Sequence, residues 1–271
     1  MITHCELRIT HCLLAAGVII FVAVFANFLT PCDPYAQDLS NALTAPNEKN
    51  LLGTDRYGRD VLSRVIVGSQ TTLCASLLLL LTISSFGSLI GAICGFKGGK
   101  IDIFLMRLSD VFLAFPQMVF AIAAAGALGG GLFNAAAALA IIGWPKYARI
   151  SRGLVLTIRE MPYMNAAKMA GTSSAGILFH HVLPNIAGPV LVTAALDIGT
   201  IIMELAGLSF LGLGAQPPTA EWGAMMNNGR SMLQTAPWVI LAPGTAIFIT
   251  VAIFNLLGDK LRDVLDVRGK T

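Results

Sequence analysis

The chain has 271 residues, of which 55% are hydrophobic and only 12% carry a charged side chain. Soluble domains carry charge on about a quarter of their residues, so this composition excludes an ordinary soluble protein and indicates an integral membrane protein surrounded by lipid. The net charge of +3 is small and no block of basic residues occurs, so we expect no nucleic-acid partner.

Long uncharged windows divide the chain into predicted membrane spans. They lie between Arg8 and Asp33, Arg64 and Lys97, Asp110 and Lys146, and Arg230 and Asp259. A spanning helix needs about 20 mainly apolar residues, so the third window holds most of two helices, which the GGG run at 129–131 separates. A further apolar region carries Asp197 and Glu204. The sequence therefore predicts an all-α protein with six transmembrane helices, at about 12–30, 72–95, 104–127, 132–149, 186–206 and 237–257.

The N-terminal span has two alternative interpretations. Its apolar run is long for a cleaved signal peptide and no small-residue cleavage site is obvious, so we expect an uncleaved membrane anchor. The stretch before it repeats ITHC at 2–5 and 9–12, so His4 and His11 would share a helix face. Residues seven apart on a helix lie about 10 Å from each other. One metal ion could not bind both copies without unwinding, so we expect no metal site in this repeat.

The outer segment at 31–70 ends in a predicted helix. From Asp60 onward, apolar residues fall at helical spacing; they are Val61, Leu62, Val65 and Ile66. This pattern favours an amphipathic helix along the membrane surface over an ordinary solvated loop. We therefore divide the chain into an anchor, outer loop and surface helix at 1–68, a membrane core at 69–258 that contains the loop 146–184, and a tail at 259–271.

The third predicted span, at about 104–127, contains a proline. Pro116 removes a backbone hydrogen bond inside this helix and permits a kink. Glycine and alanine are dense over 121–140, which allows helices to approach closely.

A polar island at 146–184 separates the fourth and fifth spans. Pro162 can begin a short helix, and Gly171 suits the left-handed residue that ends one. Thr172–Ser174 can cap a second short helix, which Pro184 would end. Two short helices around a small-residue turn predict a compact knob with an apolar side. Such a knob suits docking into a groove on a soluble partner.

Two adjacent histidines, His180 and His181, lie in this island. A metal site needs more ligands than two, and adjacent side chains on a helix point about 100° apart. We therefore expect that this pair binds no metal.

The island carries a recognisable motif. Its pattern NAAKMAG…LP resembles the cytoplasmic coupling loop of binding-protein-dependent ABC importer permeases, in which EAA is followed by three residues, G, nine residues, I, one residue and LP. Asn165 replaces the acidic residue of that motif, and His181 stands where isoleucine is common. The resemblance assigns coupling to the ATPase to Asn165, Ala166, Ala167, Gly171, Leu183 and Pro184.

The resemblance extends over almost the whole chain, because four further motifs occur in the order expected for these permeases. LGTDRYGRDVLSR, MRLSDVFLAFP, LSFLGLGAQPPTAEWG and FNLLGDKLRDVLD resemble the dipeptide, oligopeptide and nickel branch of these permeases. The resemblance implies a type I ABC importer permease fold and the second of two permease subunits. It implies a homologous permease, two ATPase subunits and an extracytoplasmic binding protein as partners. ATP and magnesium would bind to the ATPases, leaving this chain without cofactor, metal or catalytic residue.

Asp197 and Glu204 are the candidate residues of the translocation path. They lie seven residues apart in the fifth span, on one helix face. Carboxylates inside a membrane are costly and normally face a protein interior or an aqueous cavity. The resemblance implies that this span lines the path between the two permeases. We expect that the protein imports nickel, free or chelated, and the alternative substrate is a dipeptide or oligopeptide. For the two carboxylates, the alternative to a role in the path is a structural hydrogen bond.

Two residues of the outer loop 207–236, Glu221 and Trp222, are candidates for contact with the binding protein. Packing against the rest of the chain is an equal alternative. Their chemistry alone does not separate the two roles.

The distribution of basic residues predicts the orientation. Of the 18 lysine and arginine residues, 13 fall in segments that are cytoplasmic if the N-terminus is inside. We therefore expect a multi-pass protein of the inner (cytoplasmic) membrane with both termini in the cytoplasm.

Two other classes of protein remain as rivals. A stand-alone secondary transporter could use Asp197 and Glu204 for ion coupling, but it would show internal repeats with matching broken helices, and none is convincing. A membrane-embedded hydrolase would need a nucleophile and a base within the spans, whereas all four histidines lie outside them or at their inner edge. The secondary transporter also leaves the polar island unexplained.

Overall fold

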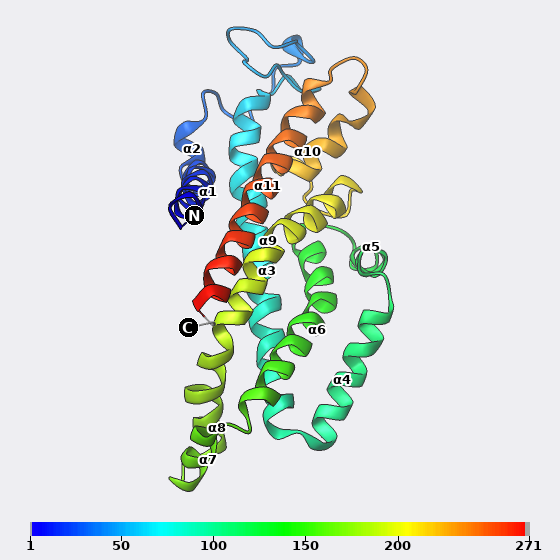
Figure 1. Ribbon diagram of the computed structural model, residues 1–271. Coiled ribbons are helices and arrows are strands. Elements are labelled where there is room, and N and C mark those ends of the chain that lie inside the picture. The colour runs from blue at the N-terminus through cyan, green and yellow to red at the C-terminus, as the bar shows by residue number, and fades with distance from the viewer. Residues whose placement is uncertain (1, 269–271) are drawn as a thin grey trace.

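The computed structural model describes residues 2–268, and the side chains of residues 10–263 among them (Figure 1). His4 and Cys5 of the ITHC repeat, and the tail side chains from residue 264 on, lie outside the described side chains. Within the described range the chain is helical and forms no named strand. The helices are α1 (Ile2–Val24), α2 (Ala26–Leu29), α3 (Val61–Lys97), α4 (Gly99–Ala114), α5 (Gln117–Ala127), α6 (Leu132–Ile158), α7 (Pro162–Met169), α8 (Ser174–Ile177), α9 (Leu183–Phe210), α10 (Trp222–Gly229) and α11 (Trp238–Arg268), with short 3-10 turns at Leu39–Asn41 and Arg230–Met232.

Three helices of the described chain are long and apolar enough to cross a membrane. They are α3, the helix that runs from Ser174 through α9 to Phe210, and α11 as far as Asp263. Together α4 and α5 have the composition of a fourth span, but they are bent by 94°. The all-α membrane architecture is thus confirmed, whereas the total of six spans stays a prediction.

The predicted span at 104–127 is broken rather than kinked. Phe115 adopts an extended conformation, with φ −94° and ψ 146°, between the end of α4 and the start of α5. A residue before proline is pushed out of the helical region by the proline ring. Pro116 therefore ends α4, and α5 leaves at a steep angle (Figure 1).

The most extensive helix contact joins α3 to α6, and glycines on α3 permit it. A Cβ atom on Gly91 would lie 2.1 Å from the carbonyl oxygen of Ala148, and one on Gly87 would lie 2.4 Å from that of Trp144. Gly95 continues the same face against Val155. This spacing of four residues brings the two backbones together, as small residues do in membrane helix pairs. Buried Leu79, Ile83, Leu139, Ile142, Leu205 and Leu208 join α3, α6 and α9 in one core.

The segment after Asp60 differs from the expected surface helix, because it forms the first turns of α3. Asp60 caps this helix by accepting a hydrogen bond from the Ser63 backbone N–H at 2.8 Å. Arg64 is buried and donates to the carbonyl oxygen of Pro34 at 3.0 Å. A buried guanidinium needs such partners, so this turn is covered by the outer loop instead of lying on lipid.

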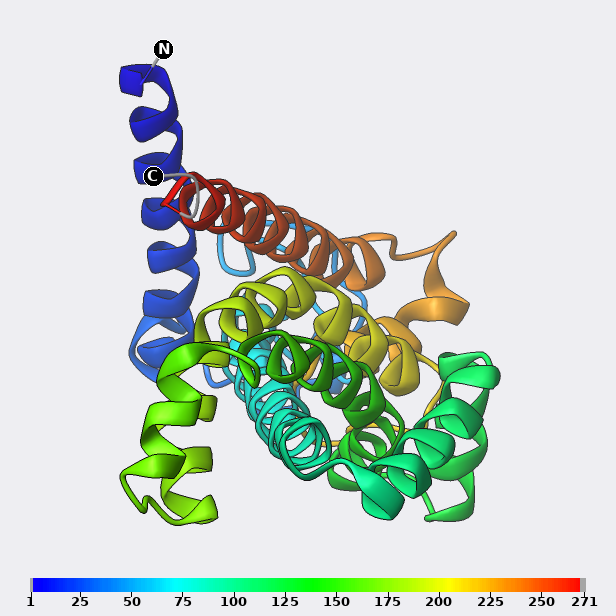
Figure 2. The ribbon, with the colours of Figure 1, turned by 60° about the horizontal axis from the view of Figure 1, so that its bottom comes forward.

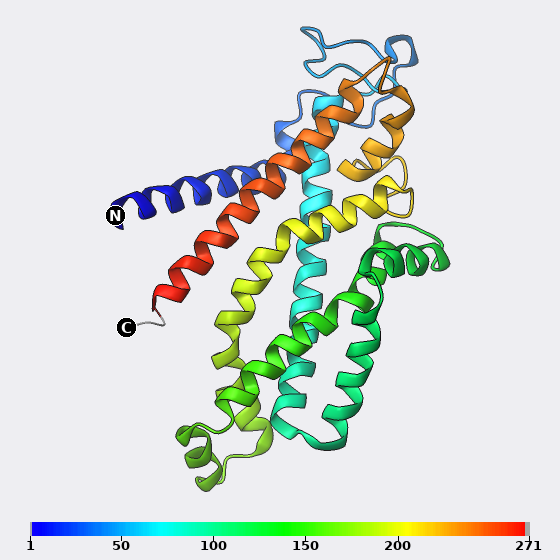
Figure 3. The ribbon, with the colours of Figure 1, turned by 45° about the vertical axis from the view of Figure 1, so that its right-hand side comes forward.

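The outer loop and the short helices lie at two opposite ends of the helix bundle. The outer loop and α10 lie at one end, and α7 with α8 lie at the other (Figures 1 and 3). Viewed from that second end, α7–α8 and α4–α5 flank opposite sides of the bundle of α3, α6 and α9 (Figure 2). Along one side of the bundle, α1 packs against α11 and α3 and tilts away toward its N-terminal end (Figure 3). The termini's side of the membrane stays a prediction.

Candidate functional site

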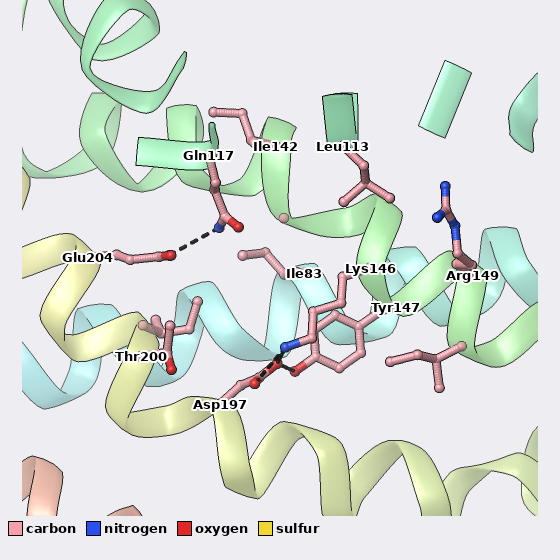
Figure 4. A pocket seen from close by; sticks show the side chains of 13 residues that line it. Ile83, Leu113, Gln117, Ile142, Lys146, Tyr147, Arg149, Asp197, Thr200 and Glu204 are labelled. Carbon is pink, nitrogen blue, oxygen red and sulfur yellow. Dashed lines mark hydrogen bonds and ion pairs between the residues drawn. The ribbon is translucent and has the colours of Figure 1, made fainter. Parts of the chain in front are cut away.

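A cavity of about 330 Å³ opens where α6 and α9 meet α3, the end of α4 and the start of α5 (Figure 4). Its wall is apolar over Ile83, Ile142 and Ile201. Its polar lining residues are Gln117, Lys146, Tyr147, Arg149, Asp197, Thr200 and Glu204. The structure thus places both predicted carboxylates, seven residues apart on α9, on the same cavity.

Asp197 is held in an ion pair that crosses from α9 to α6. The Lys146 Nζ atom lies 2.7 Å from each carboxylate oxygen, and the Tyr147 hydroxyl donates to Oδ2 at 2.9 Å. Lys146 was counted above among the cytoplasmic charges, but it lies well inside α6, which continues to Ile158. Since a lone carboxylate inside a membrane is costly, the facing lysine explains how Asp197 is tolerated.

Glu204 has a different environment from Asp197. Its Oε2 atom accepts a hydrogen bond of 3.2 Å from Gln117 Nε2, and among the described residues no ion pair to it is present. Gln117 is the first residue of α5, directly after the break at Pro116. The broken helix therefore places a neutral amide against Glu204 in the cavity lining (Figure 4).

Two further ion pairs tie α6 to α4. Arg152 forms a bidentate pair with Asp102, in which Nη2 lies 2.7 Å from Oδ2. Arg149 contacts Asp110 at 2.6 Å, and both of these side chains are about half exposed. Successive basic residues of α6 thus pair with acidic residues on α9 and α4. These pairs join different helices, so the sequence of a single predicted span does not indicate them.

The polar island forms the predicted knob. Its first helix, α7, begins at Pro162, and Gly171 follows it with a left-handed φ of +79°. The Ser173 side chain caps α8 by accepting from the Gly176 N–H at 3.1 Å. Met164 and Ile177 are buried against the ends of α3 and α6, so the knob is packed on its inner side. These local predictions are confirmed.

The helix after Gly171 does not end at Pro184, contrary to the sequence-based expectation. A π-helical turn over Leu178–Val182 runs directly into α9, and the Leu183 N–H bonds the Leu178 carbonyl. Pro184 therefore lies in the first turn of α9, where its missing N–H costs little. The widened π turn replaces the break that a proline would otherwise cause.

The residues assigned to coupling occupy two places. Asn165 and Ala166 are exposed on α7, Ala167 is half-buried beside them, and Gly171 is exposed in the turn. Leu183 and Pro184 lie at the root of α9, away from the turn. His180 contacts the Gly176 carbonyl through Nδ1 at 3.1 Å, and the described part of the chain holds no group of three or more metal-ligating acids, histidines or cysteines.

Glu221 and Trp222 are buried, which excludes direct contact with a docked binding protein in this conformation. Glu221 is 0% exposed and caps α10 by accepting from the backbone N–H groups of Gly223 and Ala224 at 3.0 and 2.8 Å. Trp222 donates its indole N–H to the carbonyl oxygen of Val65 at 2.9 Å. Burial raises the pKa of Glu221, against the opposing effect of the two backbone hydrogen bonds. The packing alternative is therefore the correct one.

Comparison with known proteins gives a consistent result. Residues 87–270 match the family described as binding-protein-dependent transport system inner membrane component. A probable D,D-dipeptide transport system permease protein of Escherichia coli (strain K12) is 42% identical over 252 residues, which cover 93% of this chain and 85% of that protein. A glutathione transport system permease protein of Salmonella typhimurium is 42% identical over 276 residues, covering 97% and 88%. A nickel transport system permease protein of Escherichia coli (strain K12) is 38% identical over 254 residues, covering 94% and 92%.

Proposed function

This chain belongs to the family of inner membrane components of binding-protein-dependent transport systems, and from that premise we propose that it carries small peptides into the cell. It is a multi-pass membrane protein and a permease subunit of an ABC importer. Its relatives are transport permeases named for dipeptide, glutathione and nickel, so identity alone does not select the solute.

One observation favours a peptide. The cavity is lined by charges of both signs, with Glu204 in one part and the Lys146–Asp197 pair in another. A peptide carries an ammonium and a carboxylate and can satisfy both. A bare nickel ion would find one carboxylate without an ion pair among the described residues, that of Glu204, because Asp197 is paired with Lys146. Nickel, the first expectation from the sequence, stays the competing substrate, supported by the nickel-named relative.

The mechanism we propose is alternating access in a complex with a homologous permease, two ATPase subunits and an extracytoplasmic binding protein. The knob of α7 and α8 would dock into a groove of one ATPase through its exposed face, which includes Asn165 and Ala166. Its buried side, at Met164 and Ile177, packs against α3 and α6, so a displacement of the knob would be passed to the helices that line the cavity. The chain transmits movement and lines half of the path, with no covalent chemistry of its own.

Affinity purification tests the assembly. The chain, tagged and expressed in its own host, is purified in mild detergent, and ATP hydrolysis by the eluate is measured. We expect co-purified ATPase subunits and hydrolysis that the binding protein stimulates. Transport by this chain alone, after reconstitution into sealed lipid vesicles, would instead indicate a secondary transporter.

A further inference from the structure

The acidic end of the cavity is Glu204, which makes no ion pair among the described residues. The basic end is the ammonium group of Lys146 on α6, which is paired with Asp197 on α9. We propose that the cavity is a subsite for a zwitterionic di- or tripeptide, with Glu204 receiving the ammonium group and Lys146 receiving the carboxylate. This inference rests on the proposed peptide import and adds the residues that would hold the peptide within this chain.

The acidic end is suited to an ammonium group. Glu204 lines the cavity, and within the described residues its carboxylate accepts one hydrogen bond, from the neutral amide of Gln117 at 3.2 Å. A carboxylate has about four acceptor positions, so most of its hydrogen-bonding capacity is open. Because an uncompensated charge in the membrane is costly, a cationic group arriving here would stabilise the site.

The basic end is suited to a carboxylate. Lys146 Nζ donates to the two oxygens of Asp197, and an ammonium group has three donors, so one N–H stays available. The Lys146 side chain is 50% exposed, whereas that of Asp197 is 15% exposed. Asp197 therefore anchors the ammonium and is itself held by the Tyr147 hydroxyl, while the more exposed Lys146 side chain lines the cavity. Arg149 also lines the cavity, with its guanidinium paired to Asp110 at 2.6 Å.

The separation of the two ends matches a short peptide. Lys146 Nζ lies 2.7 Å from the Asp197 carboxylate oxygens, so Asp197 marks the position of the basic end. Asp197 and Glu204 are seven residues apart on α9, which is about 10 Å along a helix. An extended peptide of two or three residues spans about 7–10 Å. Ile83 lies between the two polar pairs in Figure 4 and provides apolar surface for peptide side chains. The volume of about 330 Å³ is at the small end of the range for ligand pockets, which is about 300–1,000 Å³.

The test uses initial rates of labelled dipeptide uptake in cells that carry the complete transporter. The first variant is Glu204→Gln, which keeps the shape but removes the charge. The second is the double variant Lys146→Gln/Asp197→Asn, which removes the basic end without stranding Asp197 as an unpaired acid. Asp263→Asn, which removes a carboxylate from the distant tail, is the matched control. Membrane abundance and co-purified ATPase are measured for each variant.

We expect Glu204→Gln and the double variant each to lower the maximal rate about tenfold or more, as the loss of a charged hydrogen bond predicts. The half-saturating concentration should not change, since the binding protein sets it. Glu204→Asp and Lys146→Arg should each keep more of the rate than the neutral variants. Wild-type rates in both neutral variants at normal abundance would overturn the subsite while leaving peptide import intact. Absence of gene-dependent dipeptide uptake in wild-type cells would overturn the proposed substrate, and the subsite with it.

Discussion

Lys146 and Asp197 form an ion pair between α6 and α9, with the ammonium nitrogen 2.7 Å from both carboxylate oxygens. Each residue makes the other tolerable inside the membrane, because an isolated charge there would be strongly disfavoured. The pair also joins the helix that leads into the knob to the helix that leaves it. In the proposed mechanism, a movement of the knob would reach the charged residues of the cavity through these two helices.

Breaking this pair on one side should destabilise the protein more than removing it. Lys146→Met strands the Asp197 carboxylate, whereas the double variant Lys146→Met/Asp197→Leu leaves no unpaired charge. We expect the single variant to lose about 1–2 kcal/mol, a value reduced from that of a fully buried pair because Lys146 is half exposed. Thermal unfolding in detergent measures both variants. A double variant less stable than the single one would contradict this account.

The knob turn should tolerate asparagine but not valine at position 171. Gly171 has a φ of +79° and no neighbour within 4 Å of a Cβ atom, so backbone conformation rather than space decides the outcome. A left-handed conformation costs most residues roughly 1–2 kcal/mol, but asparagine adopts it more readily. We expect Gly171→Val to abolish most uptake at normal membrane abundance, and Gly171→Asn to retain it. Equal uptake by both would count against the role of this turn in coupling.

The glycine face of α3 should be intolerant of even one methyl group. A Cβ atom on Gly91 would lie 2.1 Å from the Ala148 carbonyl oxygen, which is backbone and cannot rotate away. We expect Gly91→Ala to cost about 1–3 kcal/mol through overpacking and separation of α3 from α6. Gly126→Ala is the control, because a Cβ there meets nothing within 4 Å. Melting temperatures in detergent should fall for the first variant alone.

Two substitutions of Glu221, the buried cap of α10, should destabilise the protein to different extents. Glu221 accepts hydrogen bonds from two backbone N–H groups and from the Thr72 hydroxyl at 3.2 Å. Loss of a helix cap costs about 1 kcal/mol, so Glu221→Ala should lower the free energy of unfolding by at least that amount. Glu221→Gln keeps an acceptor oxygen and should be milder. The order is checked by protease susceptibility of the outer loop. An equal loss in both variants would contradict the account, because it would show that the negative charge matters rather than the acceptor oxygen.

The knob could be predicted from residues that act on their immediate neighbours in the chain. The contacts between distant helices could not be predicted from such residues. Pro162, Gly171 and Ser173 act on their own neighbours, so their spacing was enough to place α7 and the cap of α8. Pro116 signalled a disturbance, but its neighbours did not determine a bend of 94°.

Residues that are distant in the sequence but paired in the structure were not predicted. The seven-residue spacing of Asp197 and Glu204 predicted their shared face, while Lys146 lies 51 positions away from its partner Asp197 in the chain. The two alternatives for Glu221 stayed open for a similar reason, since its hydrogen-bond partner Thr72 lies 149 positions away. Pairings of this kind come from tertiary packing, which a single sequence does not encode in any local pattern.

The most direct test of the central claim is uptake of labelled dipeptide and labelled nickel in cells with and without the gene, each with the other as competitor. The account predicts that deletion abolishes dipeptide uptake, that nickel uptake is unchanged, and that excess nickel does not compete. Loss of nickel uptake alone would contradict it. Such a result would make this chain a metal permease, with Asp197 and Glu204 on the path of a cation.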